Sequence, residues 1–297
     1  MYEIVVVSGK GGTGKTTVCA AFAHLMKQGI ICDLDVDAPD MHIISDPLIL
    51  KKYPFISGQE SVIDDGRCNG CGICLKKCRF SAVQKDEMSY RIDSQRCEGC
   101  GVCTTLCPIS AVSMIDRYSG DWYESNCRFG PMIHAQLSPG AENSGRLVSL
   151  LKQKSRECAK NNALDFILYD GSPGIGCPVI SSLSGVHLAV AVIEATPSGR
   201  HDFVRVAELC EHFGIPVSVI INKADLNPYE STAIRELCAK QNYTLIGEIP
   251  FHQDVIDAMI KKKALTETDS PIAEHIREAW AAITRKAKGT PHTLRSL

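Results

Sequence analysis

Short runs of apolar, β-branched residues alternate along most of the chain with longer segments of helical periodicity. The apolar runs lie at residues 3–7, 30–34, 165–169, 187–193, 216–221 and 244–249. Such runs are typical of strands that are buried on both faces of a parallel sheet. Segments with helical periodicity lie at about residues 15–28, 142–160, 199–213, 228–241 and 271–286. This alternation predicts an α/β fold with a parallel, helix-covered sheet.

The alternation is interrupted between residues 58 and 116, where cysteine, glycine and short turns dominate. Within this block, residues 65–83 match residues 94–112 at a constant offset of 29 positions. A duplication this short indicates a small pseudo-symmetric module. Because strands and helices resume after it, we expect residues 58–116 to form a domain inserted into a larger one made of residues 1–57 and 117–297.

Composition and charge restrict the class of protein further. The 297 residues are 44% hydrophobic and 22% charged, with 32 Lys and Arg against 34 Asp and Glu. This balance allows a sizeable core and gives no general attraction to nucleic acid or to an anionic membrane. The first residues lead directly into a glycine-rich loop, which predicts no signal peptide, and no apolar run reaches the length of a transmembrane helix. We therefore expect a cytoplasmic protein in which the high number of cysteines, 15, reflects metal binding and not disulfides.

The loop after the first apolar run carries a phosphate-binding motif. Residues 9–17, GKGGTGKTT, satisfy the pattern G-x-x-x-x-G-K-[ST] between a strand and a helix. Backbone N–H groups of such a loop surround phosphate oxygens, Lys15 reaches the β- and γ-phosphates, and the Thr16 hydroxyl binds Mg²⁺. The nucleotide-binding residues expected in the loop are Gly9, Lys10, Gly11, Gly12, Thr13, Gly14, Lys15, Thr16 and Thr17.

Two further motifs follow later apolar runs. Asp170 directly follows the run at 165–169 and precedes a glycine, which is the position of the aspartate that helps to hold Mg²⁺ in P-loop NTPases. Residues 222–225 read Asn-Lys-Ala-Asp. Taken alone, this motif favours guanine, because the Asp225 carboxylate could accept hydrogen bonds from the base.

A second lysine inside the phosphate loop, Lys10, makes the motif resemble the deviant Walker A ATPases, which include MinD, ParA, the Mrp-type iron–sulfur carriers and the nitrogenase iron protein. The resemblance implies ATP rather than GTP, with Asn222 contacting the base. It also implies that Lys10 contacts nucleotide across a dimer interface, and that Asp35 orients the attacking water or the Mg²⁺ shell. Lys10, Lys15 and Asp35 would then be the catalytic residues of a Mg²⁺-dependent ATPase. ATP would assemble it into a homodimer, or a heterodimer with a related ATPase.

Each repeat of the inserted module contains the spacing C-x2-C-x2-C-x3-C. This spacing is the signature of bacterial ferredoxins with two [4Fe–4S] clusters, in which the fourth cysteine of each run binds the other cluster. Zinc bound by paired C-x2-C motifs is the alternative. We expect a dicluster ferredoxin-like α+β domain with two ligand sets: Cys68, Cys71, Cys74 and Cys107 for one cluster, and Cys97, Cys100, Cys103 and Cys78 for the other.

Two features outside these motifs leave alternatives open. Cys177 is placed comparably to a cysteine that holds a subunit-bridging cluster in the nitrogenase iron protein. Cys127 is the only plausible second thiol, and a structural role for Cys177 is the simpler interpretation. The C-terminal segment 271–286 is amphipathic, like the membrane helix of MinD. Gly289 and Pro291 interrupt its end, which favours packing against the core and makes membrane binding a poor interpretation.

Three functions are consistent with an ATPase that carries clusters. The complete cysteine sets favour retained clusters, so the leading expectation is ATP-driven dimerisation coupled to electron transfer with an unidentified redox or client protein. The first alternative is an iron–sulfur carrier or maturation factor whose clusters are cargo. The second is a MinD-like spatial regulator in which clusters are structural or sensing elements.

Overall fold

The chain divides into two units. A computed structural model describes residues 1–86, 89–141 and 144–289. Unit 1 consists of Met1–Lys52, Trp122–Gln136 and the chain from Ser144 onward, and unit 2 consists of Tyr53–Asp121 and the segment that begins at Leu137. Unit 2 therefore reaches further at both ends than the insertion expected at 58–116. Pro291, expected to interrupt the last helix, lies outside the described residues.

A sheet of strands with both faces covered forms the centre of unit 1. The strand order of the whole sheet is β11-β10-β9-β1-β8-β2-β7-β6-β3. Neighbouring strands from β11 to β7 pair in parallel. The bounds of these strands are β1 (Tyr2–Val7), β2 (Gly29–Asp33), β7 (Gly130–Leu137), β8 (Phe166–Asp170), β9 (Leu188–Glu194), β10 (Val217–Asn222) and β11 (Thr244–Ile249). The six apolar runs of the sequence are all strands of this sheet.

Strands β7, β6 (Val112–Cys127) and β3 (Leu48–Ile63) extend the sheet beyond the sequence-based expectation. Two residues join β6 to β7, and a connection this short links antiparallel strands. The Asp64 N–H donates to the Ala111 carbonyl at 2.8 Å and the Ser119 hydroxyl to the Ser57 carbonyl at 3.0 Å, so β3 and β6 are also antiparallel. The sheet is therefore mixed and not parallel throughout.

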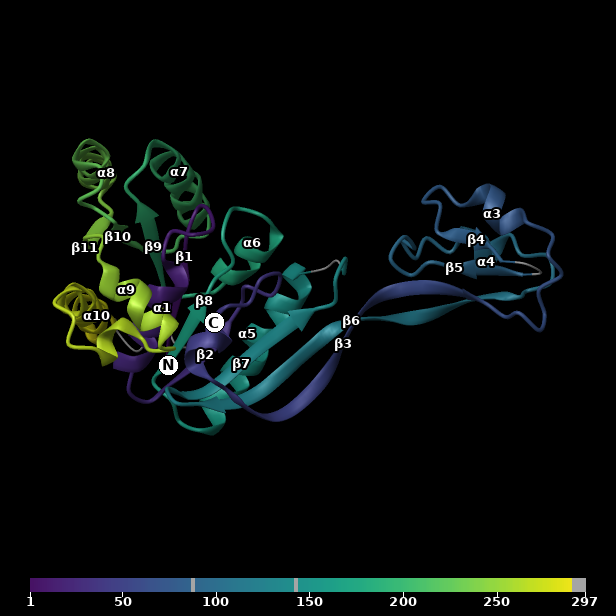
Figure 1. Ribbon diagram of the computed structural model, residues 1–297, viewed down its shortest axis with the longest axis horizontal. Coiled ribbons are helices and arrows are strands. Elements are labelled where there is room, and N and C mark those ends of the chain that lie inside the picture. The colour runs from purple at the N-terminus through teal and green to yellow at the C-terminus, as the bar shows by residue number, and fades with distance from the viewer. Residues whose placement is uncertain (87–88, 142–143, 290–297) are drawn as a thin grey trace. The chain divides into compact units, whose positions relative to one another are not determined.

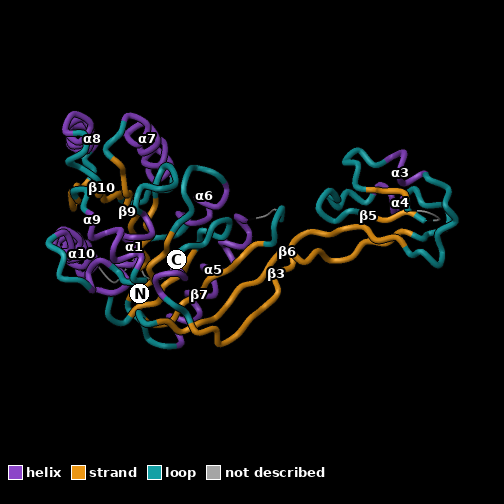
Figure 2. The backbone as a smooth tube through the Cα atoms, viewed as in Figure 1, coloured by secondary structure: helices purple, strands orange, loops and turns teal. Residues whose placement is uncertain are grey.

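Helices cover both faces of the parallel part of unit 1 (Figure 1). On one face, α1 (Lys15–Leu25) packs beside α10 (Ile272–Gly289), with the Phe22 and Trp280 ring centroids 5.2 Å apart. On the other face lie α5 (Ser144–Asn161) and α6 (Cys177–Leu183). Figure 2 distinguishes these helices from the strands by colour. The other helical segments of unit 1 are α2 (Met41–Ser45), α7 (Pro197–His212), α8 (Pro228–Gln241), α9 (Gln253–Ile260) and a 3-10 turn at Leu265–Glu267.

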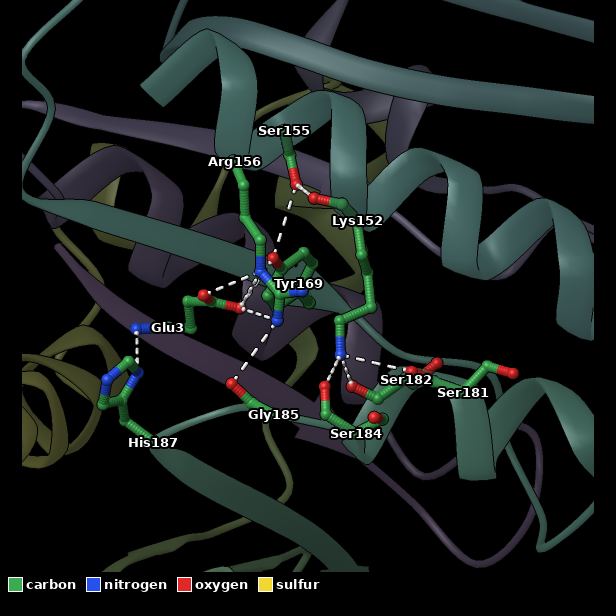
Figure 3. Close-up of polar contacts among 10 residues, drawn as sticks. All are labelled: Glu3, Lys152, Ser155, Arg156, Tyr169, Ser181, Ser182, Ser184, Gly185 and His187. Atoms are coloured by element: carbon green, nitrogen blue, oxygen red, sulfur yellow. Dashed lines mark hydrogen bonds and ion pairs between the residues drawn. The ribbon is translucent and has the colours of Figure 1, made fainter. Parts of the chain in front are cut away.

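A buried polar network connects α5 to the strands beneath it (Figure 3). The Glu3 carboxylate on β1 accepts hydrogen bonds from Arg156 Nη2 at 2.7 Å and from the Tyr169 hydroxyl at 3.0 Å. The backbone N–H of Glu3 donates to His187 Nδ1 at 3.1 Å. Tyr169 directly precedes Asp170, so this network contacts β8 one residue before the expected Mg²⁺ ligand.

Lys152 on α5 contacts the carboxyl end of α6 (Figure 3). Its Nζ donates to the carbonyls of Ser182 and Ser184 at 2.6 Å each and to that of Ser181 at 3.2 Å. The last carbonyls of a helix have no partner within the helix, so Lys152 caps α6. Burial lowers the pKa of Lys152 to about 7.

Of the described helices, none has the length and apolar content that crossing a membrane requires.

Unit 2 contains the two cysteine repeats as two similar halves. Helix α3 (Ile73–Lys77) belongs to the first repeat and α4 (Val102–Thr105) to the second, and β4 (Val83–Lys85) pairs antiparallel with β5 (Tyr90–Ile92). Ser81 and Ser110, 29 positions apart, have left-handed φ values of 53° and 50°. Few residues other than glycine adopt this conformation, so the duplication extends from the sequence to the backbone.

Candidate functional site

A cavity of about 710 Å³ lies in unit 1, among residues that follow the carboxyl ends of β1, β2, β8 and β10. This is the edge at which open α/β sheets bind ligands. Most of the nucleotide-binding residues expected from the sequence meet here. They are Gly11, Gly12, Gly14, Lys15, Thr16, Thr17, Asp35 and Asn222.

The phosphate loop ends in a glycine that no other residue could replace without strain. Gly14 has a φ of 91°, and a Cβ there would lie 2.3 Å from Asn222 Nδ2. Helix α1 begins at the next residue, Lys15. Its first backbone N–H groups therefore face the cavity, which suits an anionic ligand such as a phosphate.

Lys15 is the centre of an ion-pair cluster under the cavity. Its Nζ lies 2.6 Å from Asp170 Oδ1 and 3.8 Å from Asp35 Oδ2, and its side chain is only 6% exposed. Burial acts to lower the pKa of Lys15, but the charge and hydrogen bond of Asp170 outweigh it and raise that pKa. The Thr16 hydroxyl donates to Asp170 Oδ2 at 2.8 Å. The two expected Mg²⁺ ligands are thus neighbours, and both offer the oxygen atoms that Mg²⁺ prefers.

Asp33, an acidic neighbour of Asp35 in the sequence that was not among the expected site residues, is a buried carboxylate. It pairs in register with Asp170 across β2 and β8 and is 1% exposed. Its Oδ1 accepts from the Asp35 N–H at 3.0 Å, whereas its Oδ2 has no hydrogen-bond partner among the described residues. Burial raises the pKa of Asp33 well above its ordinary value and that of Asp35 to about 6. Asp33 could have been predicted from the sequence because it directly ends an apolar strand, as Asp170 does.

The Asn-Lys-Ala-Asp segment has a structural role in addition to its expected one. Asn222 lines the cavity, and its Nδ2 donates to the Thr13 carbonyl at 2.7 Å, which joins β10 to the phosphate loop. The Asp225 carboxylate accepts a hydrogen bond from the Phe251 N–H at 2.6 Å. This bond engages one oxygen of Asp225 and therefore weakens the guanine interpretation.

Three residues of the phosphate loop line a second, smaller cavity and not the 710 Å³ cavity. Gly9, Lys10 and Thr13 line a small depression next to α7. Lys10 Nζ lies 3.1 Å from Glu194 Oε2 in this depression. Contact of these three residues with nucleotide therefore remains a prediction.

In unit 2, four cysteines line one small cavity. They are Cys68, Cys71, Cys74 and Cys107, the crossed set expected to hold the first cluster. The Ala111 N–H donates to Cys107 Sγ at 3.2 Å. Slight burial opposes the change, but such backbone donors lower the pKa of Cys107 and, in the other repeat, that of Cys78. A lowered pKa favours the thiolate, the form that binds metal.

The second set of cysteines shows fewer contacts. Cys103 Sγ lies 3.2 Å from Ser61 Oγ. Within the described part of the chain, no three His, Cys, Asp or Glu side chains are grouped so as to hold a metal ion. Cys127 is buried at the end of β6, and Cys177 is exposed at the start of α6. The clusters and their ligands stay predictions.

The geometry of the phosphate loop agrees with the similarity of the chain to known proteins. Residues 4–265 match the family model described as the CobQ/CobB/MinD/ParA nucleotide binding domain. The chain belongs to this family. Its members MinD and ParA are ATPases, so the predicted P-loop ATPase domain is confirmed, whereas the inserted ferredoxin domain is not tested by this match.

Individual members of this family and related structures resemble the chain to different extents. An uncharacterized protein of Methanocaldococcus jannaschii is 32% identical over 281 residues, covering 94% of this chain and 95% of that protein. An iron-sulfur cluster carrier protein of Rickettsia felis is 30% identical over 116 residues, or 38% of this chain and 36% of that protein. The fold matches MinD of Pyrococcus horikoshii in complex with Mg-ADP. The TM-score is 0.57 at 14% identity, with 100% of this chain and 99% of that chain covered.

Proposed function

We propose that this family member is a Mg²⁺-dependent, ATP-hydrolysing iron–sulfur protein whose ATP-driven dimerisation is coupled to electron transfer through two [4Fe–4S] clusters. The observation that carries the proposal is the occurrence of two cavities in one chain. One lies at a phosphate loop, and the other is lined by Cys68, Cys71, Cys74 and Cys107. The occurrence of both cavities in the same chain supports a function in which nucleotide and clusters act together.

In the proposed ATPase reaction, each polar side chain of the phosphate loop and the cavity has a distinct role. Lys15 neutralises charge on the β- and γ-phosphates, and Thr16 with Asp170 holds Mg²⁺, which offsets the remaining phosphate charge. Asp35, which lines the same cavity, orients the attacking water. Asn222 contacts adenine, and Lys10 reaches the nucleotide of a second chain.

Residues 58–116, which contain both cysteine repeats, form the ferredoxin-like domain of the proposed function. A bound cluster supplies one-electron transfer. The chain contributes eight thiolates and backbone N–H groups that donate to sulfur, such as that of Ala111. Such hydrogen bonds stabilise the negative charge of a cluster and thereby tune its potential.

The proposal is tested with anaerobically purified protein. We expect about 8 iron atoms per chain and the electron paramagnetic resonance signal of reduced [4Fe–4S] clusters. Electron transfer from the reduced protein to a viologen dye should change in rate when Mg-ATP replaces Mg-ADP. Iron-free protein, or a rate that is the same with both nucleotides, would rule out the coupling.

A second candidate is an iron–sulfur carrier. The observation in its favour is the partial similarity to the carrier protein of Rickettsia felis, 30% identity over 116 residues. Mixing the cluster-loaded protein with an iron-free ferredoxin separates the two candidates. Transfer of clusters to that acceptor, accelerated by ATP, would favour the carrier, and retention of clusters would favour electron transfer.

A further inference from the structure

The carboxylate of Glu194 is shared between two lysines from distant parts of the chain. Glu194 is the last residue of β9, and its side chain is 21% exposed. Its Oε2 lies 3.1 Å from Lys10 Nζ and its Oε1 lies 2.7 Å from Lys223 Nζ. The hydrogen bond from Lys223 and, after it, that from Lys10 lower the pKa of Glu194, so the carboxylate stays charged.

Other contacts of Lys10 hold it against the β9–α7 corner, which consists of the end of β9 and the start of α7. Its Nζ lies 3.1 Å from Ser198 Oγ and 3.4 Å from Thr196 Oγ1, both at the start of α7. The backbone is closely packed here, because a Cβ on Gly199 would lie 2.3 Å from the Glu194 carbonyl oxygen. The side chain of Lys10 is 32% exposed, so solvent and ligands can reach its ammonium group.

Lys223 connects this corner to the expected base-binding residue. It directly follows Asn222, and its φ of 55° is unusual for a residue with a side chain. Strained backbone positions persist where the surrounding contacts hold them, and here the 2.7 Å ion pair with Glu194 is such a contact. If Lys10 leaves, Lys223 still neutralises Glu194, so departure of Lys10 leaves no unpaired carboxylate.

We propose that Glu194 is a positioning residue for Lys10, which it binds in the unassembled chain until the phosphate oxygens of a second subunit's ATP replace its carboxylate. This inference rests on the proposed function, in which Lys10 reaches the nucleotide of a second chain. Partly exposed ion pairs are weak, which lets phosphate oxygens compete with Glu194 for Lys10. Glu194 thereby sets how readily two ATP-bound chains assemble.

The first experiment measures Lys10 in the absence of nucleotide. The full-length wild type and Glu194→Gln are treated with N-hydroxysuccinimidyl acetate, and acetylation of Lys10 is followed by mass spectrometry. Loss of one partly exposed ion pair should accelerate acetylation about two- to fivefold. Glu248→Gln, which removes the same charge from the exposed pair with Arg235, is the matched control and should leave Lys10 unchanged. Equal rates in all three proteins would overturn the proposal.

The second experiment measures assembly by sedimentation velocity with Mg²⁺ and adenylyl-imidodiphosphate. Because a dimer contains two copies of Lys10, Glu194→Gln should lower the dimer dissociation constant about 4- to 25-fold. Glu194→Asp, which keeps the charge on a shorter side chain, should lie between this variant and the wild type. In a Lys10→Met background, Glu194→Gln should have no effect on assembly.

The role of Glu194 and the proposed function are distinguished by different outcomes of these measurements. A wild-type dimer whose dissociation constant is unchanged or raised by Glu194→Gln would overturn the role of Glu194 alone. If neither the wild type nor the Glu248→Gln control dimerises with nucleotide, the proposed function fails, and the exchange of Lys10 fails with it.

Discussion

At the residue scale, Lys15 brings a buried positive charge to the nucleotide cavity. Its ammonium group lies 2.6 Å from Asp170 and is almost fully buried. We expect Lys15→Ala to weaken ATP binding roughly 10- to 100-fold, because a charge-assisted contact to phosphate contributes about 1.5–3 kcal/mol. Titration with a fluorescent ATP analogue measures the loss. The control is Lys27→Ala, an exposed lysine shortly after the same helix, and equal affinities in both variants would contradict the role of Lys15.

The choice of base is a second property set by single residues. ATP should compete at least about tenfold better than GTP for the cavity, which corresponds to about 1.4 kcal/mol. The physical reason is that Asn222 can pair with adenine, whereas Asp225 already accepts from the Phe251 N–H at 2.6 Å. Competition against a fluorescent nucleotide tests this preference. Equal competition by both nucleotides would restore the guanine interpretation of Asp225.

Most of the expected residues that line the nucleotide cavity could be predicted because they lie in short motifs. The phosphate loop and Asp170 were identified from their immediate neighbours, and Asp35 from the family resemblance. The contact between Lys10 and Glu194 could not be predicted, because 184 positions separate the two residues and only the β9–α7 corner brings them together. The shared carboxylate of Glu194 is thus a product of tertiary structure and not of any local pattern.

The contact between α5 and α6 leads to a prediction about a whole element. Lys152→Met should leave up to three carbonyls at the end of α6 without their donor, at a cost of about 1–3 kcal/mol. Amide hydrogen exchange in α6 should therefore accelerate about tenfold. Lys154→Met is the control, since Lys154 lies on the same helix but pairs with Glu157 near the surface. Unchanged exchange in Lys152→Met would mean that other contacts hold α6.

Lys152 also gives stability a defined pH dependence. Burial, and after it the charge of Arg156, lowers its pKa from 10.5 to about 7. The unfolded chain keeps this proton up to about pH 10.5, so between pH 7 and that value the unfolded state binds more protons. The free energy of unfolding contributed by Lys152 should accordingly rise with pH across this window. Urea unfolding of the wild type and Lys152→Met at several pH values measures the difference, and a difference independent of pH would show that Lys152 stays protonated.

The elements of the sheet could be predicted only where burial on both faces produced apolar runs. Strands β3 and β6 lack such runs because they are exposed along much of their length, and residues such as Lys51 and Lys52 resemble those of a loop. Strand β7 begins with Gly-Pro, which reads as a turn. The parallel centre of the sheet therefore followed from the pattern of residues, and its antiparallel extension did not.

For the molecule as a whole, the crossed assignment of cysteines leads to a prediction about iron content. Cys78→Ala should reduce occupancy of the cluster assigned to Cys97, Cys100 and Cys103, although Cys78 belongs to the other repeat. Iron analysis should show about 8 atoms per chain in the wild type and fewer in this variant. Spectroscopy of the remaining cluster identifies which set was lost. Loss of the cluster on the first repeat alone would contradict crossed ligation.

Cys177 provides the matched comparison within the same experiment. It is exposed at the start of α6 in unit 1, and Cys177→Ala should leave the iron content unchanged. A third cluster bridging two subunits would instead give about 10 iron atoms per chain and a dimer that persists without nucleotide. Removal of two iron atoms per chain by Cys177→Ala would overturn the assignment of all cluster ligands to unit 2.

The antiparallel pairing of β3 with β6 has a consequence for the ancestry of the protein. The chain enters and leaves unit 2 on adjacent strands of one ribbon, shown by the hydrogen bonds at Ser57 and Asp64. A tight turn at any level of this ribbon would therefore yield an ordinary hairpin and leave the order of the ATPase strands intact. The cysteine-rich module could thus have been acquired in a single insertion at the tip of an existing hairpin, and descendants of the uninterrupted ancestor should still carry that hairpin beside β7.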